Sequence, residues 1–281
     1  MTASTLMIQG TSSGAGKTTL VTALCRILSD EGYKVAPFKS QNMSSYSYVG
    51  EKFEISRAQA IQAIAARTEI TPMINPILLK PLGNYNSHVF VKGISYGKMH
   101  AQDYYKKFAL YKGLTESKNS LDHLLQTNDI VILEGAGSPA EINLQQYDIA
   151  NMKMAEYCKA PVILVTDIDK GGSFASIVGT LTLLEKRHQK FIKGFIINKF
   201  RGDVTILHPS YSILKKKTGK PVFGTIPLID FDIPDEDSLH SNPKQISWST
   251  QYLNVLDKEI NHLSKIVKKN LDMKKIRGLL H

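Results

Sequence analysis

A glycine-rich segment near the amino terminus constrains this chain more than any other feature. Residues 10–19 read GTSSGAGKTT; they follow the apolar run Leu6–Ile8 and lead into the helix-forming segment Leu20–Leu24. A strand, a glycine-rich turn and Lys-Thr at a helix start form a phosphate cradle, because backbone N–H groups and the positive end of the helix dipole favour an anion. The match to G-x-x-x-x-G-K-[ST] is imperfect, since Thr11 stands where that pattern has its first glycine.

The residues of this segment predict a site for ATP and Mg²⁺. Lys17 is expected to reach the terminal phosphates, and the Thr18 hydroxyl is expected to bind the metal ion. The strand–helix context favours this interpretation over a glycine-rich turn with a chance Lys-Thr pair. The residues expected to contact ATP here are Ser12, Ser13, Gly14, Ala15, Gly16, Lys17, Thr18 and Thr19.

The composition fits a soluble enzyme. A chain of 281 residues can bury a substantial core in one large α/β domain. No segment approaches the roughly 20 uninterrupted apolar residues of a membrane span. The two cysteines, Cys25 and Cys158, lack metal-ligand spacing. We therefore expect a cytoplasmic protein without disulfides and without a membrane partner.

The net charge of +10 is partly local, because residues 241–281 carry eight basic and three acidic side chains. A basic balance suits nucleic acid, an acidic membrane surface or a polyanionic small molecule. For the carboxyl-terminal segment alone, a solvated helix face is the preferred interpretation. We divide the chain into residues 1–240, the ATP-dependent domain, and residues 241–281, a basic helical extension.

Short apolar runs alternate with helical stretches along the chain, which predicts right-handed crossovers and a mostly parallel central sheet with helices on both faces. The expected strands are Leu6–Ile8, Lys34–Phe38, Ile77–Leu79, Val89–Val91, Asp129–Leu133, Val162–Thr166, Gly194–Ile197 and Val222–Thr225. The expected helices beyond the first are Ser56–Arg67, Ala101–Gln126, Asn151–Cys158, Ser176–Lys186 and Trp248–Asn270.

Ligands of such sheets bind at the carboxyl ends of the strands, so the residues that follow each strand are informative. Lys39 follows the second strand, Glu134 ends the central one, and Asp167 with Asp169 follows the next. Together with the glycine-rich segment, these residues predict one active-site rim.

Phosphoryl transfer needs positive charge at the γ-phosphate and an aligned acceptor. Lys17 and Mg²⁺ supply the charge, with Glu134 as a metal ligand and Glu54 as a weaker second one. Lys39 would face the γ-phosphate and hold a substrate carboxylate there. Since no nucleophilic triad is visible in the sequence, the acceptor is expected to be the substrate itself.

The first glycine of the glycine-rich segment, Gly10, comes one residue earlier than in the G-x-x-x-x-G-K-[ST] pattern. This longer spacing resembles the loop of dethiobiotin synthetases, amidoligases and partition ATPases, which implies a P-loop NTPase fold of the dethiobiotin-synthetase-like type. Seven further motifs, in family order, are similar to those of cobyric acid synthases. They are residues 32–44 (GYKVAPFKSQNMS), 54–60 (EISRAQA), 75–81 (NPILLKP), 134–144 (EGAGSPAEINL), 167–172 (DIDKGG), 198–203 (NKFRGD) and 234–239 (PDEDSL).

This resemblance implies ATP- and glutamine-dependent amidation of side-chain carboxylates on an adenosylated cobyrinic acid diamide, in cobalamin biosynthesis. The implied intermediate is an acyl phosphate that ammonia attacks. The resemblance implies Lys39 at the carboxylate, Glu54 and Glu134 at Mg²⁺, and Asn198 near the adenine. It further implies corrinoid contacts, for which Gln41, Asn42 and Ser44 are the residues expected.

Cobyric acid synthases usually continue, after the 234–239 motif, into a glutamine amidotransferase domain. This sequence instead has Ser241–Lys244 and one further expected helix. Neither cysteine lies in a nucleophile-elbow setting, so we expect ammonia to come from a separate glutamine amidotransferase subunit, with free ammonia and a changed function left open. A homodimer is also left open.

Two rival functions remain. A dethiobiotin synthetase-like ligase would also activate a carboxylate-type group, although the family motifs argue against it. A partition-type ATPase would use the basic carboxyl-terminal segment on DNA or membrane. Such ATPases usually carry a lysine early in the loop, where this chain has Ser12 and Ser13. We therefore expect no nucleic-acid partner.

Overall fold

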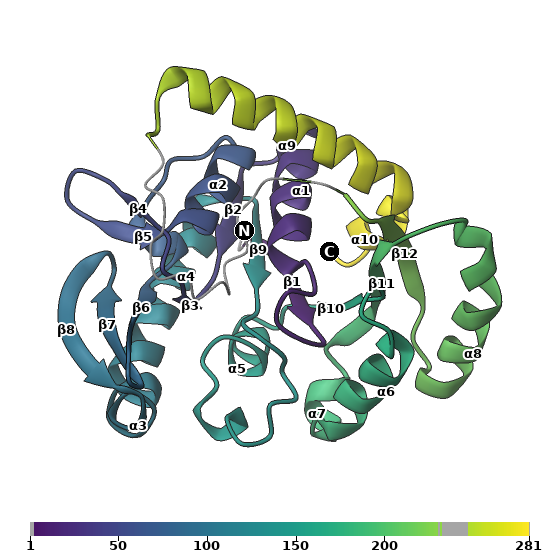
Figure 1. Ribbon diagram of the computed structural model, residues 1–281, viewed down its shortest axis with the longest axis horizontal. Coiled ribbons are helices and arrows are strands. Elements are labelled where there is room, and N and C mark those ends of the chain that lie inside the picture. Colours follow the sequence, from purple (N-terminus) through teal and green to yellow (C-terminus); the bar gives the residue numbers. More distant parts are fainter. Residues whose placement is uncertain (1–2, 230, 232–246, 281) are drawn as a thin grey trace.

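A computed structural model describes residues 3–229, 231 and 247–280 (Figure 1). The central strands are β1 (Ser4–Gly10), β2 (Val35–Phe38), β9 (Ile130–Glu134), β10 (Val162–Asp167), β11 (Ile192–Phe200) and β12 (Val222–Pro227). They form one parallel sheet in the order β12-β11-β10-β1-β9-β2. This sheet confirms the expected α/β class, and all six strands lie where the sequence predicted them.

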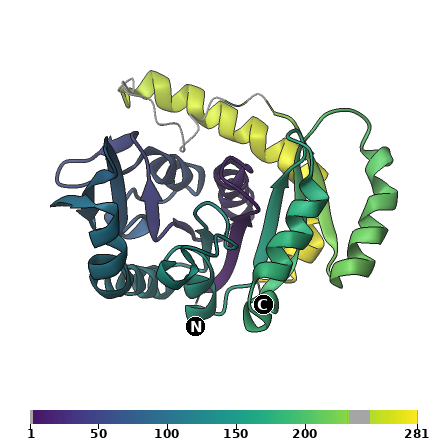
Figure 2. The same cartoon turned by 60° about the horizontal axis from the view of Figure 1, so that its bottom comes forward.

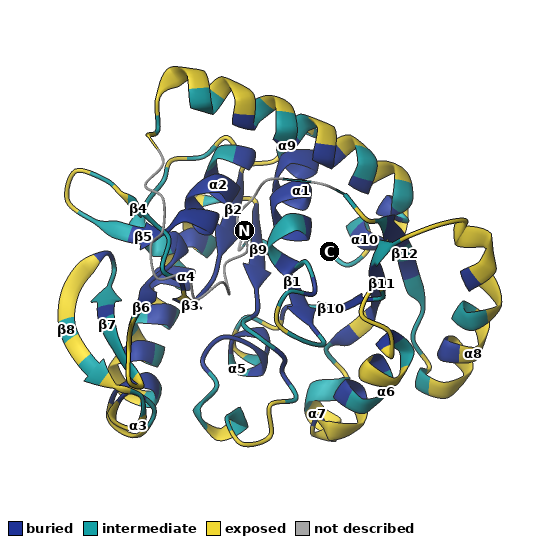
Figure 3. Cartoon of the chain, viewed as in Figure 1, coloured by how far each residue is buried: buried dark blue, intermediate teal, exposed yellow. Residues whose placement is uncertain are grey.

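Side chains along the central strands alternate between two apolar clusters. In β1, Leu6 and Ile8 belong to one cluster and Met7 to the other; in β9, Ile132 and Val131 divide in the same way. Successive side chains of a strand point to opposite faces, so continuous apolar strands need cover on both sides. Figure 3 shows these strands buried at the centre of the molecule.

Helices supply that cover on both faces of the sheet (Figure 2). The helices that pack mainly into the first cluster are α1 (Lys17–Asp30), α9 (Thr250–Asn270) and α10 (Met273–Arg277). The second cluster is packed by α4 (Leu114–Thr127), α5 (Met152–Tyr157), α6 (Ser173–Leu183) and α8 (His208–Thr218). Helix α2 (Arg57–Ala65) contributes to both clusters beside β2, and α3 (Ala101–Asp103) and α7 (Lys186–Gln189) are short.

A second, smaller sheet lies beside β2 and was not predicted. It consists of β3 (Gln41–Met43), β6 (Ile77–Gly83), β7 (Asn86–Val91) and β8 (Ile94–His100), and only β3 and β6 pair in parallel. The expected strands at Ile77–Leu79 and Val89–Val91 therefore exist, but they form an antiparallel hairpin outside the central sheet. A two-stranded ribbon of β4 (Ser47–Val49) and β5 (Glu54–Ser56) lies nearby.

The long helix expected over Ala101–Gln126 is helical throughout but changes type along its length. Residues Tyr104–Gly113 between α3 and α4 form a π-helix. Tyr104 and Phe108 from this stretch pack on Ile77 and Val89 of the small sheet. The π-helix therefore joins the small sheet to the rest of the fold, and such segments frequently occur at functional sites.

The expected carboxyl-terminal helix is present as α9, which begins after Ser249, whose hydroxyl accepts a hydrogen bond from the Tyr252 N–H. The helix packs against α1, which it crosses in Figure 1. Arg26 of α1 is 1% exposed, and its guanidinium donates to the Ala65 carbonyl of α2 (2.9 Å) and the Asp257 carboxylate of α9 (2.6 Å). One face of α9 is thus part of the core.

The predicted boundary at residue 240 lies outside the described residues, as do the 234–239 motif and Ser241–Lys244. The division of the chain into two parts therefore stays a prediction. Within the described part of the chain, none of the helices combines the length and apolar character needed to cross a lipid bilayer.

Candidate active site

The glycine-rich segment forms the turn between β1 and α1. Gly14 (φ 69°) and Gly16 (φ 94°) both have left-handed backbone angles, which glycine adopts without steric cost. At Gly16 a Cβ atom would lie 2.0 Å from Nδ2 of Asn198, so this position also lacks room for a side chain. The Lys17 ammonium donates to the carbonyls of Ser12 and Gly137, at 3.1 Å each, and so joins this turn to the loop after β9.

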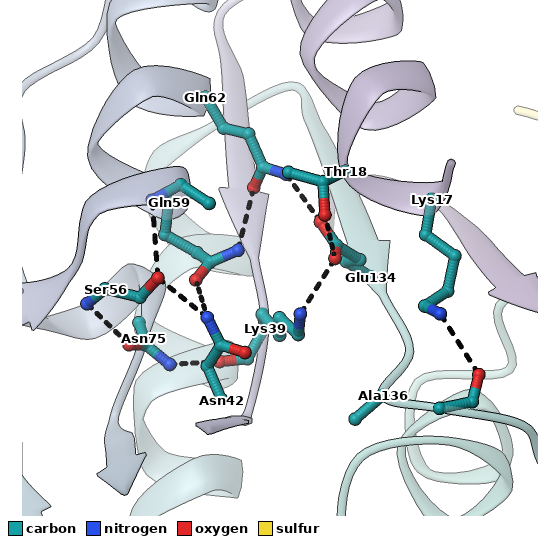
Figure 4. A network of polar contacts seen from close by, with 12 residues as sticks. Lys17, Thr18, Lys39, Asn42, Ser56, Gln59, Gln62, Asn75, Glu134 and Ala136 are labelled. Carbon is teal, nitrogen blue, oxygen red and sulfur yellow. Dashed lines mark hydrogen bonds and ion pairs between the residues drawn. The ribbon is translucent and has the colours of Figure 1, made fainter. Parts of the chain in front are cut away.

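Glu134, at the carboxyl end of β9, is the centre of a buried polar cluster (Figure 4). Its Oε1 accepts hydrogen bonds from the Thr18 hydroxyl (2.8 Å) and the Lys39 ammonium (2.9 Å). Its Oε2 accepts a bond from Nε2 of Gln62 (2.5 Å). Lys39 and Glu134 form a buried ion pair with side chains 5% and 0% exposed. The strand-end rule had placed Lys39 and Glu134 at one rim, whereas the contribution of Gln62 from α2 was missed.

The cluster continues as a chain of buried amides from Gln62 back to Lys39 (Figure 4). Gln59 donates to Oε1 of Gln62 (3.4 Å), and Asn42 donates to Oε1 of Gln59 (3.0 Å) and to the Ser56 hydroxyl (2.7 Å). The Ser56 N–H then donates to Oδ1 of Asn75 (3.0 Å). The amide of Asn75 donates to the Lys39 carbonyl (3.0 Å), which closes the ring.

The carboxyl ends of β10 and β11 support the glycine-rich turn from its other side. Asn198 donates to the Ala15 carbonyl (3.0 Å), and Lys199 donates to the Gly14 carbonyl (2.7 Å). Lys199 also pairs with the buried carboxylate of Asp167 (3.1 Å). The predicted contact of Asn198 with adenine stays a prediction; in this structure its amide holds the turn itself.

A cavity of about 370 Å³ opens beside this cluster. We call its two parts the P-loop end and the aromatic end. The P-loop end is lined by residues of the 13–19 segment together with Lys39 and Glu134. The aromatic end is lined by Met43, Tyr105, Leu144 and Tyr147. The Tyr105 and Tyr147 rings lie 5.8 Å apart, and burial raises the pKa of Tyr105.

The three residues predicted to contact a corrinoid lie in different settings. Gln41 lines the cavity, and its Oε1 accepts a hydrogen bond from the Tyr104 hydroxyl (2.7 Å). Asn42 also lines the cavity, but its amide is bonded within the buried ring. Ser44 is buried outside the cavity lining, and its hydroxyl donates to the Tyr46 carbonyl (3.1 Å).

Glu54 is not part of the cluster around Glu134. Its carboxylate pairs with Lys80 (2.6 Å) and accepts a hydrogen bond from the Ser47 hydroxyl, and it is absent from the cavity lining. The ion pair with Lys80 gives Glu54 a structural role between the ribbon and the small sheet. Its role at Mg²⁺ therefore has no support from the geometry.

Thr18 and Glu134 fit the requirements of Mg²⁺. The ion prefers oxygen ligands and usually binds through one or two carboxylates, with phosphate oxygens and waters completing the coordination. A threonine hydroxyl within 2.8 Å of a buried carboxylate, at the start of the P-loop helix, supplies such a pair of oxygens. The positive charges of Lys17 and Lys39 beside them suit the phosphate oxygens.

Neither cysteine is suited to nucleophilic chemistry. Burial raises the pKa of the Cys25 thiol, and the nearby charge of Glu134 raises it further. Burial also raises the pKa of Cys158 to about 11. Reactive cysteines instead have a depressed pKa.

Comparison with known proteins identifies a family of nucleotide-binding domains. Residues 6–238 match the family model of the CobQ/CobB/MinD/ParA nucleotide binding domain. The probable cobyric acid synthase of Thermococcus onnurineus is 54% identical over 242 residues, which are 85% of this chain and 49% of that protein. The cobyric acid synthase of Nitratidesulfovibrio vulgaris is 48% identical over 83% of this chain and 43% of its own length.

The cobyric acid synthase of Alkaliphilus metalliredigens is 46% identical over 92% of this chain and 51% of its own length. The chain thus spans about half the length of the curated relatives it matches. The match to the family model covers most of the chain and includes every strand of the central sheet except the first two residues of β1. The chain therefore belongs to the CobQ/CobB/MinD/ParA family of nucleotide-binding domains, and within it is similar to cobyric acid synthases.

Proposed function

We propose that this chain catalyses the ATP-dependent amidation of side-chain carboxylates of adenosylcobyrinic acid a,c-diamide to give cobyric acid, a step of cobalamin biosynthesis. The observation that carries the proposal is the Glu134 carboxylate, which accepts hydrogen bonds from Thr18 of the P-loop helix and from Lys39 at the next strand end. This arrangement brings a phosphate cradle and a carboxylate-binding cation to one cavity. The similarity to cobyric acid synthases supports the substrate.

The chemistry requires activation of a carboxylate. A carboxylate is a poor target for ammonia, because oxide would have to leave. In the proposed reaction a carboxylate oxygen attacks the γ-phosphorus of ATP, ADP leaves, and an acyl phosphate forms. Ammonia then attacks the acyl carbon, inorganic phosphate leaves, and a proton is lost from nitrogen to give the amide. A site for this sequence needs positive charge around the transferred phosphoryl group.

Each charged residue at the P-loop end has a proposed role in that sequence. Lys17 and the backbone N–H groups of the loop hold the ATP phosphates. Thr18 and Glu134 would hold Mg²⁺, which would supply positive charge against the phosphates of the nucleotide. Lys39 holds the substrate carboxylate in the cavity, where its ammonium offsets the repulsion between that carboxylate and the phosphates.

The aromatic end supports a large acceptor over the small one of a dethiobiotin synthetase-like ligase. Tyr105 and Tyr147 line the cavity with their rings 5.8 Å apart, and Met43, which also lines it, is 43% exposed. Such a surface suits a broad apolar body with polar groups at its edge. In the proposed complex one carboxylate arm of the corrinoid reaches Lys39 while the macrocycle rests against the tyrosines.

Ammonia itself is the proposed nitrogen donor for these 281 residues. Glutamine hydrolysis of the amidotransferase type needs an activated cysteine beside a base. Burial raises the pKa of both Cys25 and Cys158, which argues against either of them in that role. We propose a separate glutamine amidotransferase subunit as the source of ammonia in the cell.

The decisive experiment incubates the purified chain with adenosylcobyrinic acid a,c-diamide, ATP, Mg²⁺ and either ammonium or glutamine. Mass spectrometry of the corrinoid should show amidation with ammonium and none with glutamine. A Cys25→Ala, Cys158→Ala variant should behave in the same way. No amidation with either donor would contradict the proposed function, and amidation with glutamine would contradict the proposed nitrogen source.

A DNA-binding assay tests the partition-type alternative. Binding through phosphate contacts weakens steeply as salt rises, because counterions are released from the nucleic acid. We expect no ATP-dependent binding to duplex DNA at low or moderate salt. Tight, ATP-dependent and salt-sensitive binding would instead favour a partition ATPase.

A further inference from the structure

The two oxygens of Glu134 face different kinds of partner. Oε1 accepts from the Lys39 ammonium and the Thr18 hydroxyl, whereas Oε2 accepts from Nε2 of Gln62 at 2.5 Å. Gln62 and Glu134 are 0% and 1% exposed. The partner of Oε2 is therefore a neutral amide in a dry environment, where hydrogen bonds are strong and an unmatched group is costly.

A neutral donor at Oε2 has a consequence for a metal ion at Oε1. A lysine or arginine in place of Gln62 would orient the carboxylate but would also repel a divalent cation. An amide orients the carboxylate and leaves its negative charge for Lys39 and for the cation. We propose that Gln62 is a positioning residue that fixes the carboxylate of Glu134 for Mg²⁺, an inference that rests on the metal role of Glu134 in the proposed function.

The orientation of the Gln62 amide is itself determined by its neighbours. Its Oε1 accepts from Nε2 of Gln59, which lies three residues earlier on the same face of α2. The Gln59 carbonyl in turn accepts from Asn42 at 3.0 Å. A flipped Gln62 amide would set its carbonyl oxygen against the carboxylate and its N–H₂ group against that of Gln59. The buried ring therefore selects the donor-to-carboxylate orientation.

The composition of α2 argues that these glutamines are more than packing. The helix reads RAQAIQAIA, and after the buried Arg57 in its first turn the other buried residues besides the two glutamines are alanine and isoleucine, which fill space without polar atoms. Two fully buried glutamines in nine residues carry a desolvation cost that apolar side chains would avoid. In Figure 4, Gln62 reaches Glu134 and Gln59 donates to Gln62, so both buried glutamines serve the carboxylate that is proposed to bind the metal.

The test is a Mg²⁺ titration that needs no corrinoid. Gln62→Met keeps the approximate length of the side chain and removes the donor. Calorimetry with a non-hydrolysable ATP analogue would measure binding over a range of Mg²⁺ concentrations. Loss of a group that orients a metal ligand typically weakens metal affinity by about 10–100-fold, so the Mg²⁺ concentration for half-maximal binding should rise at least about tenfold. Binding of the analogue at saturating Mg²⁺ should stay within about twofold of the parent by the same reasoning.

Two further variants separate positioning from stability. Gln59→Met leaves Gln62 in place but removes its support, so the Mg²⁺ requirement should rise by less than in Gln62→Met. If Gln62→Met fails to fold, Gln59→Met provides the test of the Mg²⁺ requirement instead. Ser120→Ala is the matched control, because the Ser120 hydroxyl is buried in α4 without a hydrogen-bond partner among the described residues. It should leave the Mg²⁺ titration unchanged.

Three outcomes would overturn the inference. One is an unchanged Mg²⁺ titration in folded Gln62→Met or, if that variant does not fold, in Gln59→Met. Another is a rise in the Mg²⁺ requirement that simply follows the loss of melting temperature across the three variants, because lost stability would then explain it. The third is parent protein that binds the analogue without any Mg²⁺ dependence, which would remove the metal role of Glu134 as well. Failure of the corrinoid assay with a normal Mg²⁺ titration would contradict the proposed substrate and leave the role of Gln62 standing.

Discussion

The two ends of the cavity are held in different ways. At the P-loop end, Lys17, Lys39 and Glu134 are at most 6% exposed, and each has directed bonds that fix its position. At the aromatic end, Tyr105 and Tyr147 are partly exposed; Tyr105 packs against the apolar cluster of the small sheet, and the Tyr147 ring contacts that of Tyr105. The side chains that are expected to act on the transferred phosphoryl group are therefore fixed in position before substrate binds, as electrostatic catalysis requires. The aromatic end, which is expected to contact the acceptor, relies on apolar contacts among the described side chains instead of directed hydrogen bonds.

The largest expected effect is at the P-loop end. Lys17→Ala should lower ATP-dependent turnover by about 1,000-fold, the upper range for loss of one preorganised charged donor. The fold should persist, because the lysine ammonium donates to the carbonyls of two loops, which lie outside the strands of the sheet. Turnover and melting temperature would be measured beside Lys98→Ala, an exposed lysine on β8. Near-normal activity in folded Lys17→Ala would refute the assignment of the phosphate site.

Lys39→Met tests whether the P-loop end also holds the acceptor carboxylate. The change keeps an apolar stem and removes the charge, so acyl phosphate formation should fall by about 100-fold while ATP binding stays near normal. Lys80→Met is a matched control, since Lys80 forms a similar ion pair with Glu54 away from the cavity. If Lys39→Met instead loses ATP binding and keeps corrinoid binding, Lys39 binds the nucleotide rather than the substrate carboxylate.

Glu134→Gln should raise the Mg²⁺ requirement for turnover more than it weakens ATP binding. The amide keeps the shape of the side chain but lacks the negative charge that the metal and Lys39 both use. The expected change in half-maximal Mg²⁺ is about tenfold or more. Glu54→Gln should have a smaller effect, because its carboxylate pairs with Lys80. An equal response in the two variants would mean that the cluster around Glu134 does not define the metal site.

The aromatic end should respond more weakly and only toward the acceptor. Tyr105→Ala should raise KM for the corrinoid by about 2–10-fold, which corresponds to about 0.5–1.5 kcal/mol for one aromatic contact. KM for ATP should not change, and Tyr105→Phe should stay close to the parent. Tyr111→Ala, on the same π-helix but 67% exposed, is the control. A matching rise in KM for ATP would show that the two ends are not separate.

This contrast also explains which parts the sequence could predict. The six central strands are continuous apolar runs, and the residues after them meet at one edge of a parallel sheet, so Lys39 and Glu134 were placed together. Of the small sheet, β3 was missed because it has only three residues, and β8 because its side chains are mostly exposed and form no apolar run. The strands β4 and β5 of the ribbon also have only three residues each. Such short strands depend on tertiary pairing rather than on local pattern.

The sequence pattern also could not identify residues that reach the site only through tertiary packing. Gln62 lies in an alanine-rich helix and reaches Glu134 only because α2 packs beside β2 and β9. Tyr105 reaches the cavity through a π-helix, whose shifted hydrogen bonds change which side chains face inward. The one available signal was the pair Gln59 and Gln62 at helical spacing, which marks a polar stripe on a helix that is apolar after Arg57.

The smallest expected effect lies outside both ends, at the cap of α1. Glu31 accepts hydrogen bonds from Arg277 of α10 (2.7 and 2.9 Å) and from Lys268 of α9 (3.0 Å), and these contacts, led by that with Arg277, lower its pKa from 4.5 to about 2. The folded state therefore favours the ionised carboxyl. Its stabilisation is complete above about pH 4.5 and is lost as the pH falls toward 2.

Glu31→Gln should accordingly lower the melting temperature at pH 7 by about 2–4 °C, the shift that about 1 kcal/mol produces in a domain of this size. The difference from the parent should shrink as the pH falls below 4.5 and disappear near pH 2, because the parent carboxyl is then protonated as well. Thermal unfolding at several pH values would measure this, with the exposed Glu51→Gln as control. Kinetic constants for ATP and corrinoid should not change, since Glu31 lines neither end of the cavity. A pH-independent difference would mean that the ion pairs with Arg277 and Lys268 do not stabilise the attachment of α9 and α10.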